Sequence, residues 1–361
     1  SFLAFHNSGE VVLEAKLYWL FGFVGLYWAY CLFWGIKGAI RSKTSADYFV
    51  AGRSIGVWVF VLAATATSFS GWTFVGHPGL IFQEGLPYAF ASFYALTIPF
   101  TGVLFLRRQW ILGRSFGYIT PGEMYSDYYG GNAMRLLTVL VAFLFSVPYL
   151  GVQLRASGDL FHVLTDGLVS IEIGMFALSA VVVIYVASGG LRSVAYVDCA
   201  QCILLALGIV ILGGIAITYI GGWTAFTTGV GKMVEQNLTT GTKITPTGHS
   251  SLVALPGAIQ TVSANTEAVG SSWTGIMCMT YMFALMGIQS APAFSMWAFA
   301  NKDPRPFSWQ QVFASSVIIG GILFFFTAIQ GLGGALLDLE LIPGTSRLDV
   351  PGGDSLVPYL I

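Results

Sequence analysis

Runs of mostly apolar residues, each about 20 residues long, recur along this chain and constrain its fold more than any other feature. A run of that length is what a helix needs to cross the hydrocarbon core of a bilayer. Only 9% of the residues are charged, against about 25% in soluble domains. The sequence therefore predicts an all-α polytopic membrane protein with eight spans, at residues 17–36, 57–84, 86–106, 135–163, 169–188, 195–218, 272–300 and 309–335.

The positive charges predict the orientation of these spans. Loops on the cytoplasmic side of a membrane protein carry an excess of lysine and arginine. Alternating loops place eleven of the 16 basic residues on one side. These are Lys37, Arg41, Lys43, Arg53, Arg107, Arg108, Arg114, Arg135, Arg192, Lys302 and Arg305. We therefore expect a multi-pass protein of the plasma membrane, or of a bacterial inner membrane, with its N-terminus outside.

Two function classes find no support in the composition. The net charge is −1, without the basic surplus that is typical of nucleic-acid binding. The four histidines fall on separate segments, and the sequence has neither a metal-binding histidine pair nor a nucleophile elbow. We therefore expect a protein that is not an enzyme, that needs no cofactor and that binds no nucleic acid.

The span at 57–84 changes character in its middle. Residues 66–71 read Ala-Thr-Ser-Phe-Ser-Gly, where a helix that only faced lipid would carry leucine or isoleucine. Small polar residues at this depth favour unwinding, which exposes main-chain carbonyls to a cavity inside the protein. Interrupted helices of this kind hold the substrate and ion sites of many secondary transporters. The alternative is an ordinary helix with a packing notch for a neighbouring helix.

The span at 272–300 carries a second interruption. Gly287-Ile-Gln289-Ser290-Ala-Pro292 separates two helical halves, and Pro292 suits the first turn of the second half. Ser290 could cap that half, and unwinding there would free hydrogen-bonding groups near Gln289. The alternative is a simple proline kink.

The two interruptions lie five helices apart if the first span is an extra one, as in an inverted five-plus-five repeat. The expected organisation is a single membrane domain over 1–361. Within it we assign an extra N-terminal helix (17–36), a first repeat (57–218), an extracellular loop (219–271) and the truncated start of a second repeat (272–335).

Three motifs give the chain a family resemblance. They are Ser-Ala-Asp-Tyr-Phe-Val-Ala-Gly-Arg-Ser at 45–54, Ser70-Gly71-Trp72 with Gly76, Pro78 and Gly79, and Tyr-Val-Ala-Ser-Gly-Gly-Leu-Arg-Ser at 185–193 followed by Val194, Asp198 and Gln201. Over residues 45–335 the chain resembles the sodium:solute symporter family, which contains sodium/proline, sodium/glucose and sodium/monocarboxylate carriers. The resemblance implies a LeuT-like fold and Na⁺ as the coupling ion.

The resemblance also implies an ion site at the first interruption. Members bind Na⁺ there through two main-chain carbonyls, at the positions of Ala66 and Phe69. Further oxygens come from a later helix that this chain does not reach. Sodium/proline members carry an aspartate at the position of Ser68, which here is a neutral hydroxyl. Ser70 is a further candidate oxygen.

Asp198 is a candidate for the ion exit path. It matches an aspartate implicated in the inward exit of the ion in the family. An acid inside a membrane span is costly and therefore a functional candidate in its own right. Gln201 lies about one turn further on, on the same face. The alternative is a solvated acid at the helix end that pairs with Arg192.

Arg155 and Gln153 are candidates for solute binding. Arg155 could attract a substrate carboxylate from outside, although it could equally form a neutralised pair with Asp159 at i+4. Ser68, Trp72, Gln289 and Ser290 complete the candidate solute site. Few acids or amides are available to grip several hydroxyls, so a monocarboxylate or amino acid is preferred over a sugar.

These features predict Na⁺-coupled symport of a small polar organic solute by alternating access. The expected partners are the solute, Na⁺ and the lipid bilayer. An alternative is a solute-sensing membrane domain of a transporter-like receptor, in which a C-terminal module, fused or missing from this chain, would be a signalling kinase. The sequence after residue 361 would separate the two.

Overall fold

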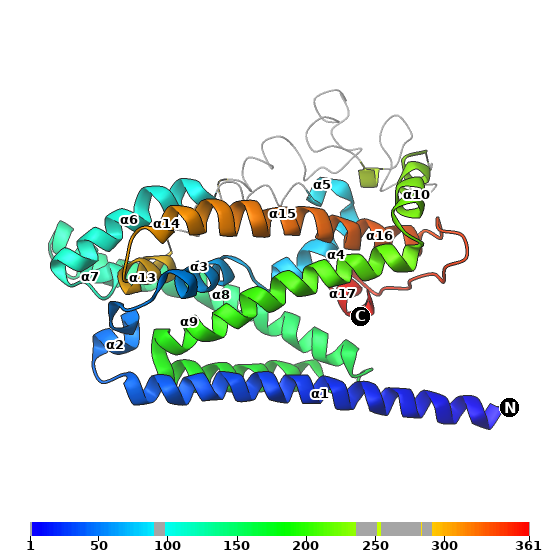
Figure 1. The fold of residues 1–361 in the computed structure, drawn as a ribbon, viewed down its shortest axis with the longest axis horizontal. Coiled ribbons are helices and arrows are strands. Elements are labelled where there is room, and N and C mark those ends of the chain that lie inside the picture. The colour runs from blue at the N-terminus through cyan, green and yellow to red at the C-terminus, as the bar shows by residue number, and fades with distance from the viewer. Residues whose placement is uncertain (1, 90–97, 236–250, 254–282, 284–290, 361) are drawn as a thin grey trace.

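The structure, a computed structural model, describes residues 2–89, 98–235, 251–253, 283 and 291–360 (Figure 1). This part of the chain is helical, and its only β-type pairing is an isolated parallel bridge between Ile55 and Asn301. Four of the described helices are long and apolar enough to cross a membrane, namely Ala15–Arg41 within α1, Ala133–Leu164, Ile171–Ile220 and Pro306–Asp338. A bent pair, Val57–Ser68 with Trp72–Glu84, gives a fifth if it is counted as one span.

The described helices fall into two halves along the chain. The first half contains α1 (Phe2–Arg41), α2 (Ser45–Val50), η1 (Ala51–Arg53), α3 (Val57–Ser68), η2 (Trp72–Gly76), α4 (His77–Glu84), α5 (Leu86–Ala89), α6 (Ile98–Phe116), α7 (Pro121–Tyr129), α8 (Ala133–Leu164) and α9 (Ile171–Ile220). The second half contains α10 (Trp223–Glu235), η4 (Ser251–Val253), α13 (Pro292–Ala300), α14 (Pro306–Trp309), η6 (Gln310–Ile319), α15 (Gly320–Ile322), η7 (Leu323–Thr327), α16 (Ala328–Asp338), η8 (Gly353–Ser355) and α17 (Leu356–Leu360). Elements α14 to α16 form the continuous Pro306–Asp338 helix.

Several predicted spans coincide with described helices that are long and apolar enough to cross a membrane. The predictions at 17–36, 135–163 and 309–335 fall inside long apolar helices, and 57–84 is the bent pair. The predictions at 86–106 and 272–300 lie partly outside the described residues. The count of eight spans and the second interruption therefore stay predictions.

The predicted spans 169–188 and 195–218 are the two arms of α9. They meet at Gly190, whose dihedral angles (φ 60°, ψ −160°) interrupt the helix. Figure 1 shows one arm beside α1 and the other crossing back toward α10. This conformation is essentially restricted to glycine. A Cβ at Gly190 would lie 2.4 Å from the carbonyl oxygen of Tyr48, so α2 packs directly against the bend.

The helices are joined by two large apolar clusters. One packs α3 against α6 and α13, around Phe60, Phe294 and Phe299. The other packs α4 against α16, the end of α9 and α10, around Ile81 and Leu336. The two halves of the bent pair thus belong to different clusters.

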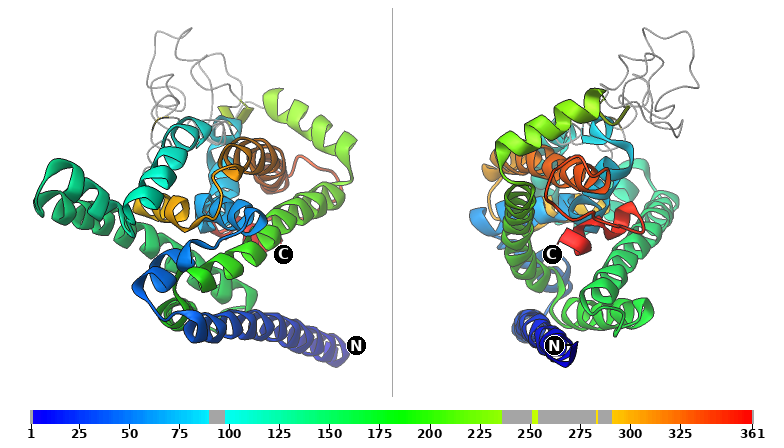
Figure 2. Two further views of the ribbon diagram at one scale, coloured as in Figure 1. Left: turned by 60° about the vertical axis from the view of Figure 1, so that its left-hand side comes forward. Right: turned by 90° about the vertical axis from the view of Figure 1, so that its right-hand side faces the viewer.

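The eleven basic residues assigned above to the cytoplasmic side lie on the elements of one end of the molecule, which we call the basic end. Helices α2, α7, α13 and α14 lie at this end, on the left of Figure 1. Main-chain bonds join the start of α3 to the end of α13, since Ile55 N–H donates to Ala300 O (3.2 Å) and Lys302 N–H donates to Ile55 O (2.9 Å). Figure 2 shows the C-terminal segment entering between α8 and α9, with Leu356 and Val357 fully buried.

We predict that Gly190→Ala destabilises the protein. The backbone conformation alone would cost roughly 1–3 kcal/mol, before the contact with Tyr48 is counted. Gly214→Ala, in the same helix with no atom within 4 Å of the added Cβ, should be neutral or stabilising by up to about 1 kcal/mol. Thermal unfolding of the two variants in detergent measures the difference. Equal melting temperatures would contradict the role assigned to Gly190.

Candidate functional site

The predicted interruption of the 57–84 span is confirmed, and it lies at residues 69–71. Helix α3 ends at Ser68, and Phe69 has an extended backbone (φ −125°, ψ 144°). The chain then re-enters a helical path at Gly71, with a π-helical turn before α4. The two halves are bent by 61° relative to one another.

Hydroxyl side chains weaken the helix just before this break. Thr65, Thr67 and Ser68 donate to the carbonyls four residues earlier, on Val61 (2.6 Å), Ala63 (2.9 Å) and Ala64 (3.3 Å). Such bonds compete with the helical ladder and favour bending. The small polar residues therefore supply a local cause for the unwinding.

The main-chain groups freed by the break find new partners. Phe69 N–H donates to Ala66 O (3.0 Å), and Ser70 N–H donates to the Thr73 hydroxyl (3.2 Å). Gly71 N–H donates to Oε1 of Gln153 on α8 at 2.6 Å. The Nε2 atom of Gln153 is buried and has no hydrogen-bond partner within the described chain. Gln153 therefore accepts a hydrogen bond from the main chain at the break, and within the described chain its Nε2 donor remains unused.

A cavity of ≈ 850 Å³ lies beside the break, and we call it the central cavity. Six predicted site residues line it together: Ala66, Phe69, Ser70, Gln153, Asp198 and Gln201. They come from the end of α3, from the break itself, from α8 and from the second arm of α9. The predicted ion-site and exit-path residues thus face one space.

Asp198 does not pair with Arg192, the alternative that the sequence left open. The Arg192 guanidinium donates to Ala51 O (2.8 Å) and to the Ser54 hydroxyl (3.0 Å). None of the ion pairs formed by described residues involves Asp198. The Asp198 carboxylate therefore lines the central cavity with no basic side chain to neutralise it there.

The N-terminal helix also contributes to this cavity. Tyr27 of α1 lines the central cavity, and its hydroxyl accepts a hydrogen bond from Nε2 of Gln201. Trp297 of α13 also lines this cavity and donates from its indole nitrogen to the Thr67 hydroxyl (3.0 Å). Tyr27 could not be predicted as a site residue from the sequence, because its partner lies 174 residues away.

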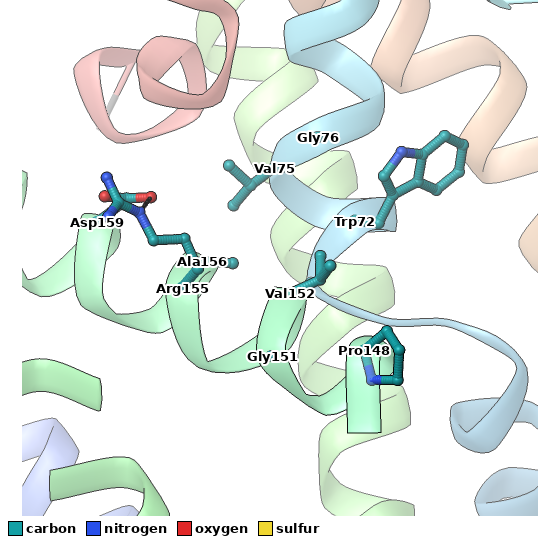
Figure 3. A pocket seen from close by; sticks show the side chains of 10 residues that line it. Trp72, Val75, Gly76, Pro148, Gly151, Val152, Arg155, Ala156 and Asp159 are labelled. Atoms are coloured by element: carbon teal, nitrogen blue, oxygen red, sulfur yellow. Dashed lines mark hydrogen bonds and ion pairs between the residues drawn. The ribbon is translucent and has the colours of Figure 1, made fainter. Parts of the chain in front are cut away.

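A second cavity, of ≈ 470 Å³, lies on the other side of Gly71, and we call it the outer pocket. It lies between η2 and α8 and is lined by Trp72, Arg155 and Asp159, among others (Figure 3). Nε of Arg155 lies 3.0 Å from Oδ2 of Asp159, and the Arg155 side chain is 63% exposed. Figure 3 shows the Trp72 indole turned away from Arg155. Gly71 lines both cavities.

The remaining candidates for the solute site are not seen to line either cavity within the described part of the chain. Ser68 is buried and lies outside the lining of both cavities. Gln289 and Ser290 lie outside the described residues, so their predicted role at the second interruption is not tested.

Both halves of the broken span are hydrogen-bonded to the Pro306–Asp338 helix. Nε2 of Gln310 donates to the Thr65 hydroxyl in α3 (3.1 Å). In α4, Nδ1 of His77 lies 2.9 Å from the Thr327 hydroxyl. One continuous helix thus holds α3 and α4 at their mutual angle.

Residues 48–304 match the family model described as the sodium:solute symporter family. The chain belongs to this family. Its members are transporters and not enzymes.

The curated relatives are named for different solutes. The sodium/proline symporter of Escherichia coli is 28% identical over 191 residues, covering 50% of this chain and 37% of that protein. The high-affinity choline transporter 1 of Drosophila melanogaster is 31% identical over 204 residues, covering 56% and 31%. The sodium/glucose cotransporter 1 of Ovis aries is 29% identical over 191 residues, covering 51% and 27%. The matched region therefore spans well under half of each relative.

A solved structure shows the same fold. It is the substrate-bound outward-open state of a Na⁺-coupled sialic acid symporter, with a TM-score of 0.69 and 18% sequence identity. The match covers 97% of this chain and 68% of that chain. This likeness supports the predicted LeuT-like fold.

We predict that Gln153→Leu destabilises the protein by about 1–3 kcal/mol, because Gly71 N–H loses its acceptor at the break. Gln153→Glu keeps an acceptor oxygen at the same reach and should retain most of the stability. Thermal unfolding of both variants makes the comparison. A Leu variant as stable as the Glu variant would show that the 2.6 Å bond is not needed.

Proposed function

We propose that this protein carries out Na⁺-coupled symport of a small polar organic solute by alternating access, with a monocarboxylate or an amino acid preferred over a sugar. The observation that carries the proposal is the break at residues 69–71, which opens onto a cavity of ≈ 850 Å³. Family membership and the names of the relatives support Na⁺ coupling.

The proposed Na⁺ ligands are the main-chain carbonyls of Ala66 and Phe69, with the Ser70 hydroxyl nearby. Oxygen donors suit a hard cation. The Ala66 carbonyl already accepts from Phe69 N–H, but a carbonyl has two lone pairs and one remains for an ion. Phe69 has left the helical path, so its carbonyl is not aligned with the ladder of α3.

The proposed solute site joins the outer pocket to the central cavity across Gly71. An anionic solute would meet the exposed Arg155 first, and Arg155 would exchange Asp159 for the solute carboxylate. Nε2 of Gln153 then offers a donor deeper in the protein. Trp72 and Ser68, together with Gln289 and Ser290, complete the proposed set. Asp198 and Gln201 are proposed to line the inward exit of the ion.

The proposed topology keeps the organisation inferred from the sequence. Residues 17–36 are an extra helix, 57–218 a first repeat, 219–271 an extracellular loop and 272–335 the start of an inverted second repeat. The N-terminus lies outside and the basic end faces the cytoplasm of a plasma or inner membrane. The likeness in fold over 97% of the chain supports the LeuT-like fold on which this proposed topology is based.

The energetics of the proposal are adequate. One cation moving inward across about 100 mV supplies about 2.3 kcal/mol, and each tenfold of solute gradient costs about 1.4 kcal/mol. A single Na⁺ could thus sustain roughly 40-fold accumulation of a neutral solute before its own concentration gradient is counted.

We predict that Ala66→Leu abolishes Na⁺ dependence. The added side chain would enter the central cavity at the proposed ion site. Purified full-length protein should be stabilised by Na⁺ but not by K⁺, through binding to the folded state. The variant should show no such shift while melting near the wild-type temperature in K⁺. If Na⁺ still raises the melting temperature of the variant, the ion binds elsewhere.

We predict that Arg155→Ala raises the apparent KM for an anionic solute by roughly tenfold or more, because the solute carboxylate loses one charged hydrogen-bonding partner. Asp159→Asn is the matched control, because it removes the competing carboxylate and should lower the KM or leave it unchanged. Uptake kinetics of both variants in vesicles measure this. Unchanged kinetics in Arg155→Ala would remove Arg155 from the solute site without touching the Na⁺ proposal.

A further inference from the structure

A third pocket lies at the basic end, between α6 and the start of the Pro306–Asp338 helix. Its volume is ≈ 330 Å³, and it is lined by Val103, Arg107, Pro304, Arg305, Phe307 and Ser308. It shares none of its lining residues with the central cavity or the outer pocket. Neither the ion nor the solute proposal uses it.

The pocket is positively charged. Arg107 is exposed, and within the part of the chain that the structure describes it makes neither an ion pair nor a hydrogen bond. Arg305 is paired with Asp303, and this bond from Arg305 holds the pKa of the Asp303 carboxyl below its ordinary value. Two guanidinium groups thus line the pocket, and within the described chain only that of Arg305 is paired with a carboxylate. Arg108, the next residue of α6, is also exposed and adds a further positive charge to this helix.

An exposed apolar strip begins at Trp309, one residue after Ser308 of the pocket lining. Trp309, Phe313 and Val317 follow one another at four-residue spacing, and all three are exposed. The rings of Trp309 and Phe313 lie 5.9 Å apart, and Trp58 of α3 packs edge-on against Trp309 at 6.1 Å. Val103 and Leu104 expose apolar surface on α6. Tryptophan at such a boundary is typical of the level where lipid headgroups meet acyl chains.

We propose that this pocket binds the phosphate of an anionic phospholipid, with an acyl chain lying along the strip of Trp309, Phe313 and Val317. A planar guanidinium presents paired N–H donors that match phosphate oxygens. Basic pockets between helices on the cytoplasmic side suit anionic headgroups. A free phosphate would satisfy Arg107 and Arg305 equally well, but it would leave the apolar strip without a role. The charge and the strip together therefore favour a lipid.

The test uses the full-length protein purified in detergent. Phosphatidylglycerol, phosphatidylcholine or inorganic phosphate is added, and thermal unfolding and lipid retention by native mass spectrometry are measured. Arg107→Gln and Arg107→Gln/Arg305→Gln are compared with Arg41→Gln. Arg41 is an exposed arginine at the same end, outside the pocket, so this variant changes the net charge equally.

We expect phosphatidylglycerol, but not phosphatidylcholine or inorganic phosphate, to stabilise the wild type and Arg41→Gln. Arg107→Gln should lose more than half of the shift and of the retained lipid, and the double variant should lose nearly all. In phosphatidylcholine Arg107→Gln should melt with the wild type, because Arg107 makes no bond to the described chain. Arg107→Lys should retain part of the shift.

Two results would overturn the proposal. Equal losses in Arg107→Gln and Arg41→Gln would reveal a diffuse charge effect rather than a site. Full stabilisation by inorganic phosphate, lost in Arg107→Gln, would assign the pocket to a free anion. Neither result bears on Na⁺ or solute binding.

Discussion

Inside a membrane, every main-chain polar group that leaves a helix has to find another partner, and the structure at residues 69–71 is organised around that requirement. The break frees main-chain groups, and the protein satisfies Gly71 N–H with a side chain from α8 at 2.6 Å. The free-energy cost of unwinding the helix is offset because α8 holds a hydrogen-bond acceptor in place for the freed main chain. Since the partner of Gly71 comes from another helix, the break and the packing of α8 depend on one another.

The broken span is hydrogen-bonded more extensively to the Pro306–Asp338 helix than to α8. On one side, the Pro306–Asp338 helix is hydrogen-bonded to both halves of the span, through Thr65 and His77. On the other side, Gln153 makes the one side-chain bond between α8 and the break that the described residues show. A relative movement of α8 and the break would therefore have to exchange this hydrogen bond. The central cavity and the outer pocket are both lined by residues of α8 and by Gly71 of the break.

The sequence predicted the elements that depend on local composition. Span positions follow from apolar runs, and the break follows from small hydroxylated residues that compete with the helical ladder. Partners far apart in sequence were not predictable, as Thr67 and Trp297 show at a separation of 230 residues. Arg192 illustrates the limit: its closeness to Asp198 in sequence suggested a pair, but it bonds instead to Ala51 O, 141 residues away.

The basic residues of one end show how the same charge can serve two purposes. Arg53, Arg114 and Arg192 donate to main-chain carbonyls where helices end, on Tyr118, on Asn301 and on Ala51 respectively. Terminal carbonyls carry partial negative charge, so a guanidinium stabilises them. Arginines of the kind that orient a membrane protein therefore also cap the main-chain carbonyls at helix ends here. Arg107 makes no such bond to the described chain, and this difference underlies the proposal that it binds an anionic headgroup.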